Sequence, residues 1–115
     1  MGGHSDVISH PAKRHSFIEK ALRPLLEVAR GSRAIYAWDI INEPEWRMDG
    51  SGAASGVPVS DKAMVRFVNA VIRAIRRDCP GQRITLGCAN RQWLRYWLGP
   101  SRASGYGFVD LPSDH

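Results

Sequence analysis

The chain contains little cysteine, no long hydrophobic run and no internal repeat. Its two cysteines, Cys79 and Cys88, do not form the C-x-x-C pattern of a zinc or redox site. We interpret them as two buried or partly buried thiols in preference to a structural disulfide. No stretch approaches the roughly 18 to 20 apolar residues that a membrane-spanning helix needs, so we expect a soluble chain with no membrane partner.

The amino terminus lacks the features of a targeting segment. Residues 1–6, Met-Gly-Gly-His-Ser-Asp, have neither the basic start nor the apolar centre of a signal peptide. Asp6 also occupies the position at which N-myristoylation requires Ser or Thr. So polar a beginning suggests a start inside a longer reading frame, and the sequence leaves the localisation unknown.

The composition is that of a globular chain with an excess of positive charge. A length of 115 residues allows one domain at most. Because 43% of the residues are hydrophobic and 23% are charged, the composition argues against disorder. The net charge of +5 raises the question of nucleic-acid binding. The densest cationic group, Arg73, Arg76 and Arg77, lies at the end of an expected helix, where positive charge complements the helix dipole. We therefore expect no nucleic-acid partner.

The first half of the chain predicts a helix followed by a buried strand. Ser16 and Glu19 have the spacing of a capping box, so we expect a helix to start at Ser16. Its apolar stripe recurs at three- and four-residue spacing and consists of Ile18, Leu22, Leu25, Leu26 and Ala29. Pro24 should kink or restart this helix, and Gly31 should end it. Residues 34–42 are apolar at nearly every position, as in a parallel strand covered on both faces.

The second half repeats the alternation of helix and strand. We expect a helix over residues 60–78, ended by Pro80-Gly81, and a strand over residues 83–88. The buried stripe of this helix consists of Met64, Phe67, Val68, Val71, Ile72 and Ile75. A short aromatic segment at 92–98 precedes a third strand that begins near 108–111. This alternation predicts the parallel strands of an α/β fold, and both an open sheet and a closed barrel satisfy it.

The most informative segment is 34–46, Ala-Ile-Tyr-Ala-Trp-Asp-Ile-Ile-Asn-Glu-Pro-Glu-Trp. It predicts a strand that stops at Asn42-Glu43-Pro44, which places a carboxyl group and an amide at the strand's carboxyl end. Enzymes built from β/α units keep their catalytic groups at that end. A Gly- and Ser-rich loop, 47–59, follows the same strand end. Loops of this length inside a compact unit are usually functional or mobile.

The segment Trp-Asp-Ile-Ile-Asn-Glu-Pro, 38–44, resembles the fourth-strand motif of clan A glycoside hydrolases, family 5 in particular, which includes cellulases and mannanases. The resemblance implies a (β/α)8 TIM barrel that hydrolyses O-glycosidic bonds of β-linked oligo- or polysaccharides. Glu43 would be the general acid/base of a retaining glycosidase. Asn42 would hydrogen-bond the sugar 2-hydroxyl.

The resemblance extends over roughly residues 16–115, although only the Asn-Glu-Pro segment is specific. Residues 84–87 resemble strand five, and 107–115 resemble the start of strand six, where the family often has a His. His115 is therefore a substrate-binding candidate. Residues 1–115 would form an incomplete catalytic barrel domain, from about the third barrel helix to the start of the sixth strand.

The expected chemistry needs two carboxyl groups about 5 to 5.5 Å apart, one to protonate the leaving oxygen and one to attack the anomeric carbon. A strand end beside the aromatic Trp46 suits Glu43, because a general acid must keep its proton near neutral pH. Trp46 also offers a flat face for a sugar ring. Trp93 and Trp97 could do the same, but ordinary packing is the better interpretation of both. No metal or organic cofactor is implied.

Other polar residues have weaker claims. Strand alternation would place Asp39 on the same face as Glu43 and deeper inside a barrel, where a carboxyl must be paired or neutral. We therefore expect Asp39 to have a structural role or to support the residues that touch substrate, and not to take part directly in catalysis. Glu45 has no assigned role beyond shaping the loop or meeting substrate. Three histidines near the amino terminus match no zinc pattern, and we interpret them as part of a solvated polar loop: His4, His10 and His15.

The resemblance also has a gap. The family's nucleophile is a Glu at the end of strand seven, whereas the resemblance reaches only strand six, and a complete barrel needs about 200 to 250 residues. We expect either a piece of a longer hydrolase or a short protein that hides its open strand edges by self-association. On both accounts the 115-residue chain alone should lack substantial glycosidase activity. The alternative function is a non-catalytic carbohydrate-binding or self-associating half-barrel module, and the sequence does not identify the glycan.

Overall fold

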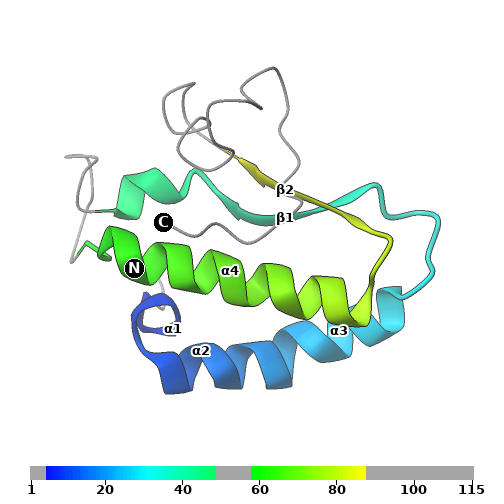
Figure 1. The fold of residues 1–115 in the computed structure, drawn as a ribbon, viewed down its shortest axis with the longest axis horizontal. Helices are drawn as coiled ribbons and strands as arrows, with labels where there is room; N and C mark the ends of the chain where they lie inside the picture. The colour runs from blue at the N-terminus through cyan, green and yellow to red at the C-terminus, as the bar shows by residue number, and fades with distance from the viewer. Residues whose placement is uncertain (1–4, 49–57, 88–115) are drawn as a thin grey trace.

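The structure is a computed structural model of the 115-residue chain, and it describes residues 5–48 and 58–87. The elements in chain order are α1 (Asp6–Ser9), α2 (Pro11–Phe17), the π-helical turn η1 (Ile18–Leu22), α3 (Arg23–Ala29), β1 (Ala37–Asn42), the 3-10 turn η2 (Pro44–Arg47), α4 (Asp61–Asp78) and β2 (Arg83–Gly87). Figure 1 shows α2, η1 and α3 running alongside α4, with β1 and β2 next to each other on one side of the helices. The predicted α/β class with parallel strands is confirmed.

The first helical run starts earlier than the capping-box pattern predicted. The backbone is helical from Pro11 onward, so Ser16 lies inside α2 and the predicted start at Ser16 is wrong. Pro11 suits the first helical position because the N–H that it lacks would have no partner there. Glu19 does not cap the helix. Its carboxylate instead accepts a hydrogen bond of 2.8 Å from Arg23 Nη1, one turn further along the chain.

Pro24 interrupts the regular α-helix, as predicted. Its ring removes the N–H that would bond to the carbonyl of Lys20. The residues directly before α3, Ile18–Leu22, form a π-helical turn, and the α-helix resumes at Arg23 with Pro24 in its first turn. The whole run therefore remains continuous while its hydrogen-bond pattern changes once.

The buried stripe of this run is confirmed at four of its five predicted positions, Ile18, Leu22, Leu26 and Ala29. The fifth, Leu25, is 53% exposed, so its assignment to the core is wrong. The buried residues Ile18, Leu22 and Leu26 follow one another at a spacing of four through the π-helical turn. Leu25 is adjacent to Leu26, and adjacent residues on a helix point roughly 100° apart, so Leu25 lies outside this stripe.

Gly31 ends the run as predicted. The last helical residue is Ala29, and Gly31 follows with a φ of 75°. The Ser32 N–H donates to the Ala29 carbonyl oxygen at 3.0 Å, which closes a turn through Gly31. A residue with a Cβ would be strained at this φ, so glycine is the residue that the turn requires.

The long helix α4 agrees with the prediction. Ser60 is its N-cap, and the Ser60 hydroxyl accepts a hydrogen bond of 3.2 Å from the Ala63 N–H. All six residues of the predicted stripe are buried. After Asp78 the chain turns through Pro80-Gly81, and the Gln82 N–H donates to the Cys79 carbonyl oxygen at 3.1 Å. This short turn leads directly into β2.

The two strands form a parallel pair whose register explains where β1 begins. Ala37 lies opposite Arg83, the first residue of β2, so residues 34–36 have no partner in β2 and the predicted strand start at 34 is three residues too early. Tyr36 instead packs beside Arg83. The Arg83 guanidinium carbon lies 5.2 Å from the Tyr36 ring centroid, and Arg83 Nη1 donates to the Tyr36 hydroxyl at 3.1 Å.

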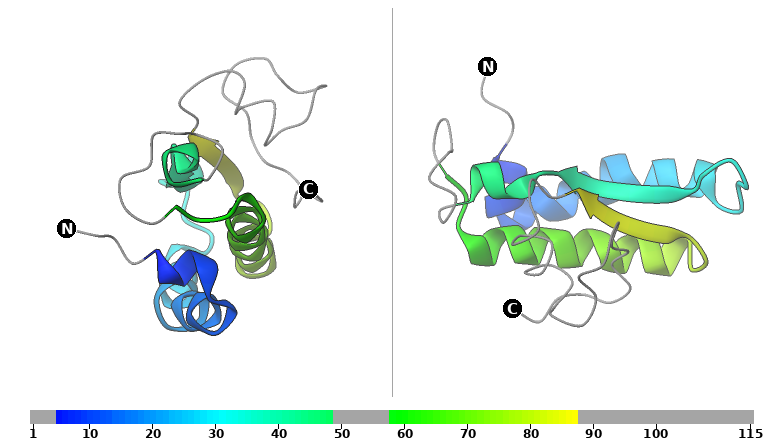
Figure 2. Two further views of the ribbon diagram at one scale, coloured as in Figure 1. Left: turned by 90° about the vertical axis from the view of Figure 1, so that its left-hand side faces the viewer. Right: turned by 90° about the horizontal axis from the view of Figure 1, so that it is seen from above.

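The core lies between the helices and one face of the strand pair (Figure 2). Ile84 and Leu86 of β2 are buried on that face, whereas Thr85 between them is only partly buried. Asp39 and Asn42 of β1 are exposed, so the expectation that this strand is covered on both faces is wrong for the part of the chain that is described. The helices therefore leave an open face of the pair on which polar side chains can act.

The N-terminal ends of the strands are fastened to the helices by the Gln82 side chain. The Trp38 indole N–H donates to Gln82 Oε1, and Gln82 Nε2 donates to the Ala29 carbonyl oxygen at 3.2 Å. The amide thus links β1 to the end of α3 with both of its polar atoms.

Of the helices in the described ranges, none is long and apolar enough to cross a bilayer.

Candidate active site

Asn42 and Glu43 lie at the carboxyl end of the strand pair. Asn42 is the last residue of β1, Glu43 follows it, and β2 ends alongside at Gly87. Because the strands are parallel, both carboxyl ends lie at the same end of the sheet (Figure 1). The Asn42 side chain is exposed and Glu43 is partly buried. The predicted location of the pair is therefore confirmed.

Glu43 has an unusual backbone conformation. Its φ of 50° and ψ of 56° lie in the left-handed region, and Glu43 is the one non-glycine residue with positive φ in the described ranges. Its N–H donates to the Gly87 carbonyl oxygen at 2.8 Å, so the neighbouring strand holds it there. Such strained residues are found preferentially at functional sites, where the surrounding structure maintains them. The turn redirects the chain directly at the carboxylate.

The segment after Glu43 is anchored in the core. Pro44 begins η2, and the Glu45 side chain is only 2% exposed. Met48 is fully buried, and its N–H donates to the Glu45 carbonyl oxygen at 3.1 Å. Met48 also pairs with Val59, which precedes α4. Of the two roles left open for Glu45, shaping the segment is the one that its burial favours.

A bulge in β1 changes which side chains share a face. Asp39 lies opposite Thr85, but Asn42 lies opposite Gly87, so two residues of β1 correspond to one residue of β2 between these pairs. Simple alternation from Asp39 to Glu43 is therefore wrong, because the register shifts and the strand ends before Glu43. The open face carries Asp39 and Asn42 instead. The Asp39 carboxylate is exposed, not deep in an interior, and its Oδ1 accepts a hydrogen bond of 3.3 Å from the Gly87 N–H.

Gly87 is the residue of this site that sequence reasoning missed. A Cβ added at Gly87 would overlap Asn42 Oδ1 and would lie 3.4 Å from Asn42 Cγ. A glycine at a strand end next to a functional pair is the signal that could have identified it, because glycine in a strand often marks a close approach.

Several predicted residues lie outside the described part of the chain. They are the side chain of Trp46 and the residues Cys88, Trp93, Trp97 and His115. The expected aromatic segment at 92–98 and the third strand near 108–111 also lie there. The roles assigned to these residues stay predictions.

The remaining histidines and the cysteine of the described ranges lie apart from Asn42 and Glu43 in the chain. His10 and His15 are exposed, in agreement with a solvated segment, but His10 is the N-cap of α2 and His15 lies within α2, so the predicted loop is wrong there. His4 lies outside the described residues. Cys79 is a buried thiol, as predicted, and its Sγ donates to the Leu26 carbonyl oxygen at 3.4 Å. Within residues 5–48 and 58–87, no group of three His, Cys, Asp or Glu side chains is arranged to hold a metal ion.

A charged cluster around Asp78 joins α4 to α3, away from the carboxyl ends of the strands. Arg23 donates to Asp78 Oδ2 at 2.9 Å and to Glu19 at 2.8 Å, and Arg30 Nε donates to the Asp78 carbonyl oxygen at 2.9 Å. Arg77 lies 3.5 Å from the Asp78 carboxylate. The hydrogen bond from Arg23 lowers the pKa of Asp78 below its ordinary value. At least part of the chain's positive charge is thus used in structural ion pairs.

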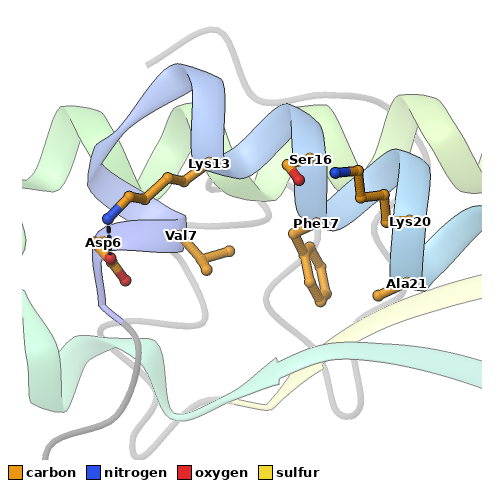
Figure 3. Close-up of a pocket in the computed structure, with 7 residues that line it drawn as sticks. All are labelled: Asp6, Val7, Lys13, Ser16, Phe17, Lys20 and Ala21. Atoms are coloured by element: carbon orange, nitrogen blue, oxygen red, sulfur yellow. Dashed lines mark hydrogen bonds and ion pairs between the residues drawn. The ribbon is translucent and has the colours of Figure 1, made fainter.

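An open pocket of about 390 Å³ lies on the amino-terminal helices and not at the carboxyl ends of the strands (Figure 3). Its lining residues come from α1, α2 and η1: Asp6, Val7, Lys13, Ser16, Phe17, Lys20 and Ala21. Lys13 already forms an ion pair with Asp6, and the Phe17 ring packs near the Phe67 ring at 6.2 Å between centroids. This pocket contains none of the predicted site residues.

Comparison with known proteins points to one class, the enzymes that act on β-1,4-mannan. No family model matches the chain. It is 31% identical over 120 residues to a mannan endo-1,4-beta-mannosidase of Mytilus edulis, an alignment that covers 90% of this chain and 30% of that enzyme. The chain therefore spans about a third of the length of the curated relative that it matches.

Two solved structures agree with this similarity. A β-1,4-mannanase from the common sea hare Aplysia kurodai superposes with a TM-score of 0.70 and 29% identity, over 77% of this chain and 31% of that one. The endo-1,4-beta-mannanase of Eisenia fetida gives the same TM-score with 25% identity, over 83% of this chain and 30% of that one. In sequence and in backbone, the chain is similar to about a third of a mannanase-type glycoside hydrolase.

Proposed function

We propose that residues 1–115 are the part of a retaining β-glycoside hydrolase that supplies the general acid/base, and that its substrate is β-1,4-mannan. The observation that carries the proposal is the position of Asn42-Glu43-Pro44 at the carboxyl end of a parallel strand, in a chain similar to mannanases. Glycoside hydrolases with β/α architecture place their carboxyl groups at such an end. The similarity to mannanases favours mannan over the glucan that the motif alone left open.

We assign the roles within this proposal from the resemblance of Asn42-Glu43-Pro44 to the fourth-strand motif of clan A glycoside hydrolases. Glu43 protonates the leaving oxygen in the first step and removes a proton from the attacking water in the second. Asn42, exposed on the open face next to it, binds the sugar 2-hydroxyl, and this bond strengthens in the transition state. The left-handed backbone of Glu43 is consistent with a carboxylate that a strained turn holds in position.

The complete catalytic unit is proposed to be a (β/α)8 barrel of the clan A, family 5 type. The similarity to a third of each mannanase and the parallel pair support this proposal. Glu43 supplies one of the two carboxyl groups that retention requires, so residues 1–115 by themselves are expected to lack substantial activity. Robust mannan hydrolysis by the purified 115-residue chain would contradict that part of the proposal.

The experiment that tests the proposal replaces Glu43 in the full-length protein that contains this chain. Glu43→Gln keeps the size of the side chain but cannot give or take the proton, so kcat on β-1,4-mannan should fall about 10²- to 10⁴-fold. Glu27→Gln is the matched control, because Glu27 is exposed on α3 and should leave kcat unchanged. Wild-type turnover by Glu43→Gln would refute the assignment. Retained mannan binding without turnover in the unmodified protein would favour the non-catalytic binding module.

A further inference from the structure

The bulge in β1 is the feature that turns Asn42 toward the open face. Asp39 and Asn42 are three residues apart, so an unbroken strand would point them to opposite faces. The register shift between them cancels this difference, because Asn42 pairs with Gly87 two residues after Thr85, the partner of Asp39. Both side chains are exposed on the same face as a result. Bulges of this kind re-aim side chains next to active sites.

Three contacts from the proposed site converge on Gly87. Its carbonyl oxygen accepts the hydrogen bond from the Glu43 N–H at 2.8 Å. Its N–H donates to Asp39 Oδ1 at 3.3 Å. Its Cα faces the Asn42 carboxamide, which occupies the space that a Cβ would take. One glycine thus touches both members of the Asn42-Glu43 pair and is itself held by a carboxylate.

We propose that Asp39 and Gly87 are positioning residues for the reaction. Asp39 holds the Gly87 backbone across the bulge, and Gly87 fixes the Glu43 backbone and leaves room for the Asn42 carboxamide. The inference rests on the proposed function, since it concerns how the same two residues are oriented. Neither Asp39 nor Gly87 touches substrate in this account.

The first test is a double-mutant cycle in the full-length protein, with kcat and KM measured on β-1,4-mannan oligosaccharides. Gly87→Ala should displace the Asn42 carboxamide and lower kcat, since a misplacement of about 1 Å costs roughly 10²-fold. Gly81→Ala is the matched control, because a Cβ at Gly81 meets nothing within 4 Å. In the Asn42→Ala background the clash is gone, so Gly87→Ala should change kcat by less than about twofold.

The results separate this inference from the proposed function. Wild-type kcat in Gly87→Ala, or a loss in the Asn42→Ala background as large as in the wild type, would overturn the inference while Asn42→Ala and Glu43→Gln stay impaired. Wild-type kcat in Asn42→Ala or Glu43→Gln would show that the proposed function itself has failed, and the inference with it.

The Asp39 side chain gives a second test that does not depend on how Gly87→Ala folds. Asp39→Ala removes the acceptor for the Gly87 N–H and should lower kcat about tenfold, with a smaller change in KM, because the pair is oriented less well for the transition state. Asp39→Asn keeps an oxygen that can accept the same bond, so kcat should return to within about threefold of the wild type. Equal losses in Asp39→Asn and Asp39→Ala would overturn the positioning role, as would wild-type kcat in Asp39→Ala.

Discussion

The left-handed backbone of Glu43 predicts an inverted order of stability for two substitutions. At an ordinary position alanine is more stable than glycine by roughly 0.5–1 kcal/mol, because glycine loses more backbone freedom on folding. At Glu43 the φ of 50° adds a penalty of about 1–2 kcal/mol to any residue that carries a Cβ. The two effects oppose each other, and the second is larger. From the middle of each range, Glu43→Gly should therefore be more stable than Glu43→Ala by about 0.7 kcal/mol.

The measurement is the free energy of unfolding of the two variants in urea, in the full-length protein. Both variants lack the carboxylate, so the difference between them isolates the backbone. The same pair at Glu27, an exposed residue inside α3, provides the control, and there alanine should be the more stable by about 1 kcal/mol. If Glu43→Ala proves as stable as Glu43→Gly or more so, the strained turn does not exist and the geometric account of the site is wrong.

Two further predictions concern the helices. Ile72→Ala in α4 removes a fully buried side chain and should lower the free energy of unfolding by about 2–5 kcal/mol, whereas Val28→Ala, at a position 84% exposed, should change it by less than about 0.5 kcal/mol in the same urea titration. The hydrogen bond from Arg23 depresses the folded-state pKa of Asp78. Its contribution to stability is therefore present above the ordinary carboxyl pKa of 3.8 and is lost as the pH falls through the lower folded-state value. Thermal unfolding of Asp78→Asn should lack this acid-range dependence, and an unchanged pH profile would contradict the role of the ion pair.

The elements with regular periodicity could be predicted from the sequence. The stripe of α4 and its serine N-cap are local signals, because a helix buries residues three and four apart and leaves its first N–H groups to a cap. The parallel pair followed from the alternation of helix and strand. The position of Asn42 and Glu43 at a strand end followed from the Pro44 that stops the strand.

The errors arose where one local signal competed with another or where a partner strand decided. The capping-box spacing of Ser16 and Glu19 was genuine, but Pro11 provides an earlier helix start, and Glu19 pairs with Arg23 instead. The beginning of β1 depends on where β2 offers a partner, which residues 34–36 do not reveal by themselves.

The bulge could not be read from the sequence at all. Alternation assumes equal residue counts on both strands, and the two-to-one correspondence between Asp39 and Asn42 exists only in the paired sheet. For this reason the sequence placed Asp39 with Glu43, whereas the structure places it with Asn42. The contacts of Gly87 could not be predicted either, because they are made with residues more than forty positions earlier in the chain.

The most direct test of the central claim is the product that Glu43→Ala forms from an activated aryl β-mannoside in the presence of azide. A good leaving group needs no acid, and azide needs no base, so azide can attack the glycosyl-enzyme in place of water. If Glu43 is the general acid/base, azide should raise the rate and yield a β-configured glycosyl azide. An α-configured azide would show that Glu43 is the nucleophile. The absence of any azide product would show that Glu43 is not one of the two catalytic carboxyl groups.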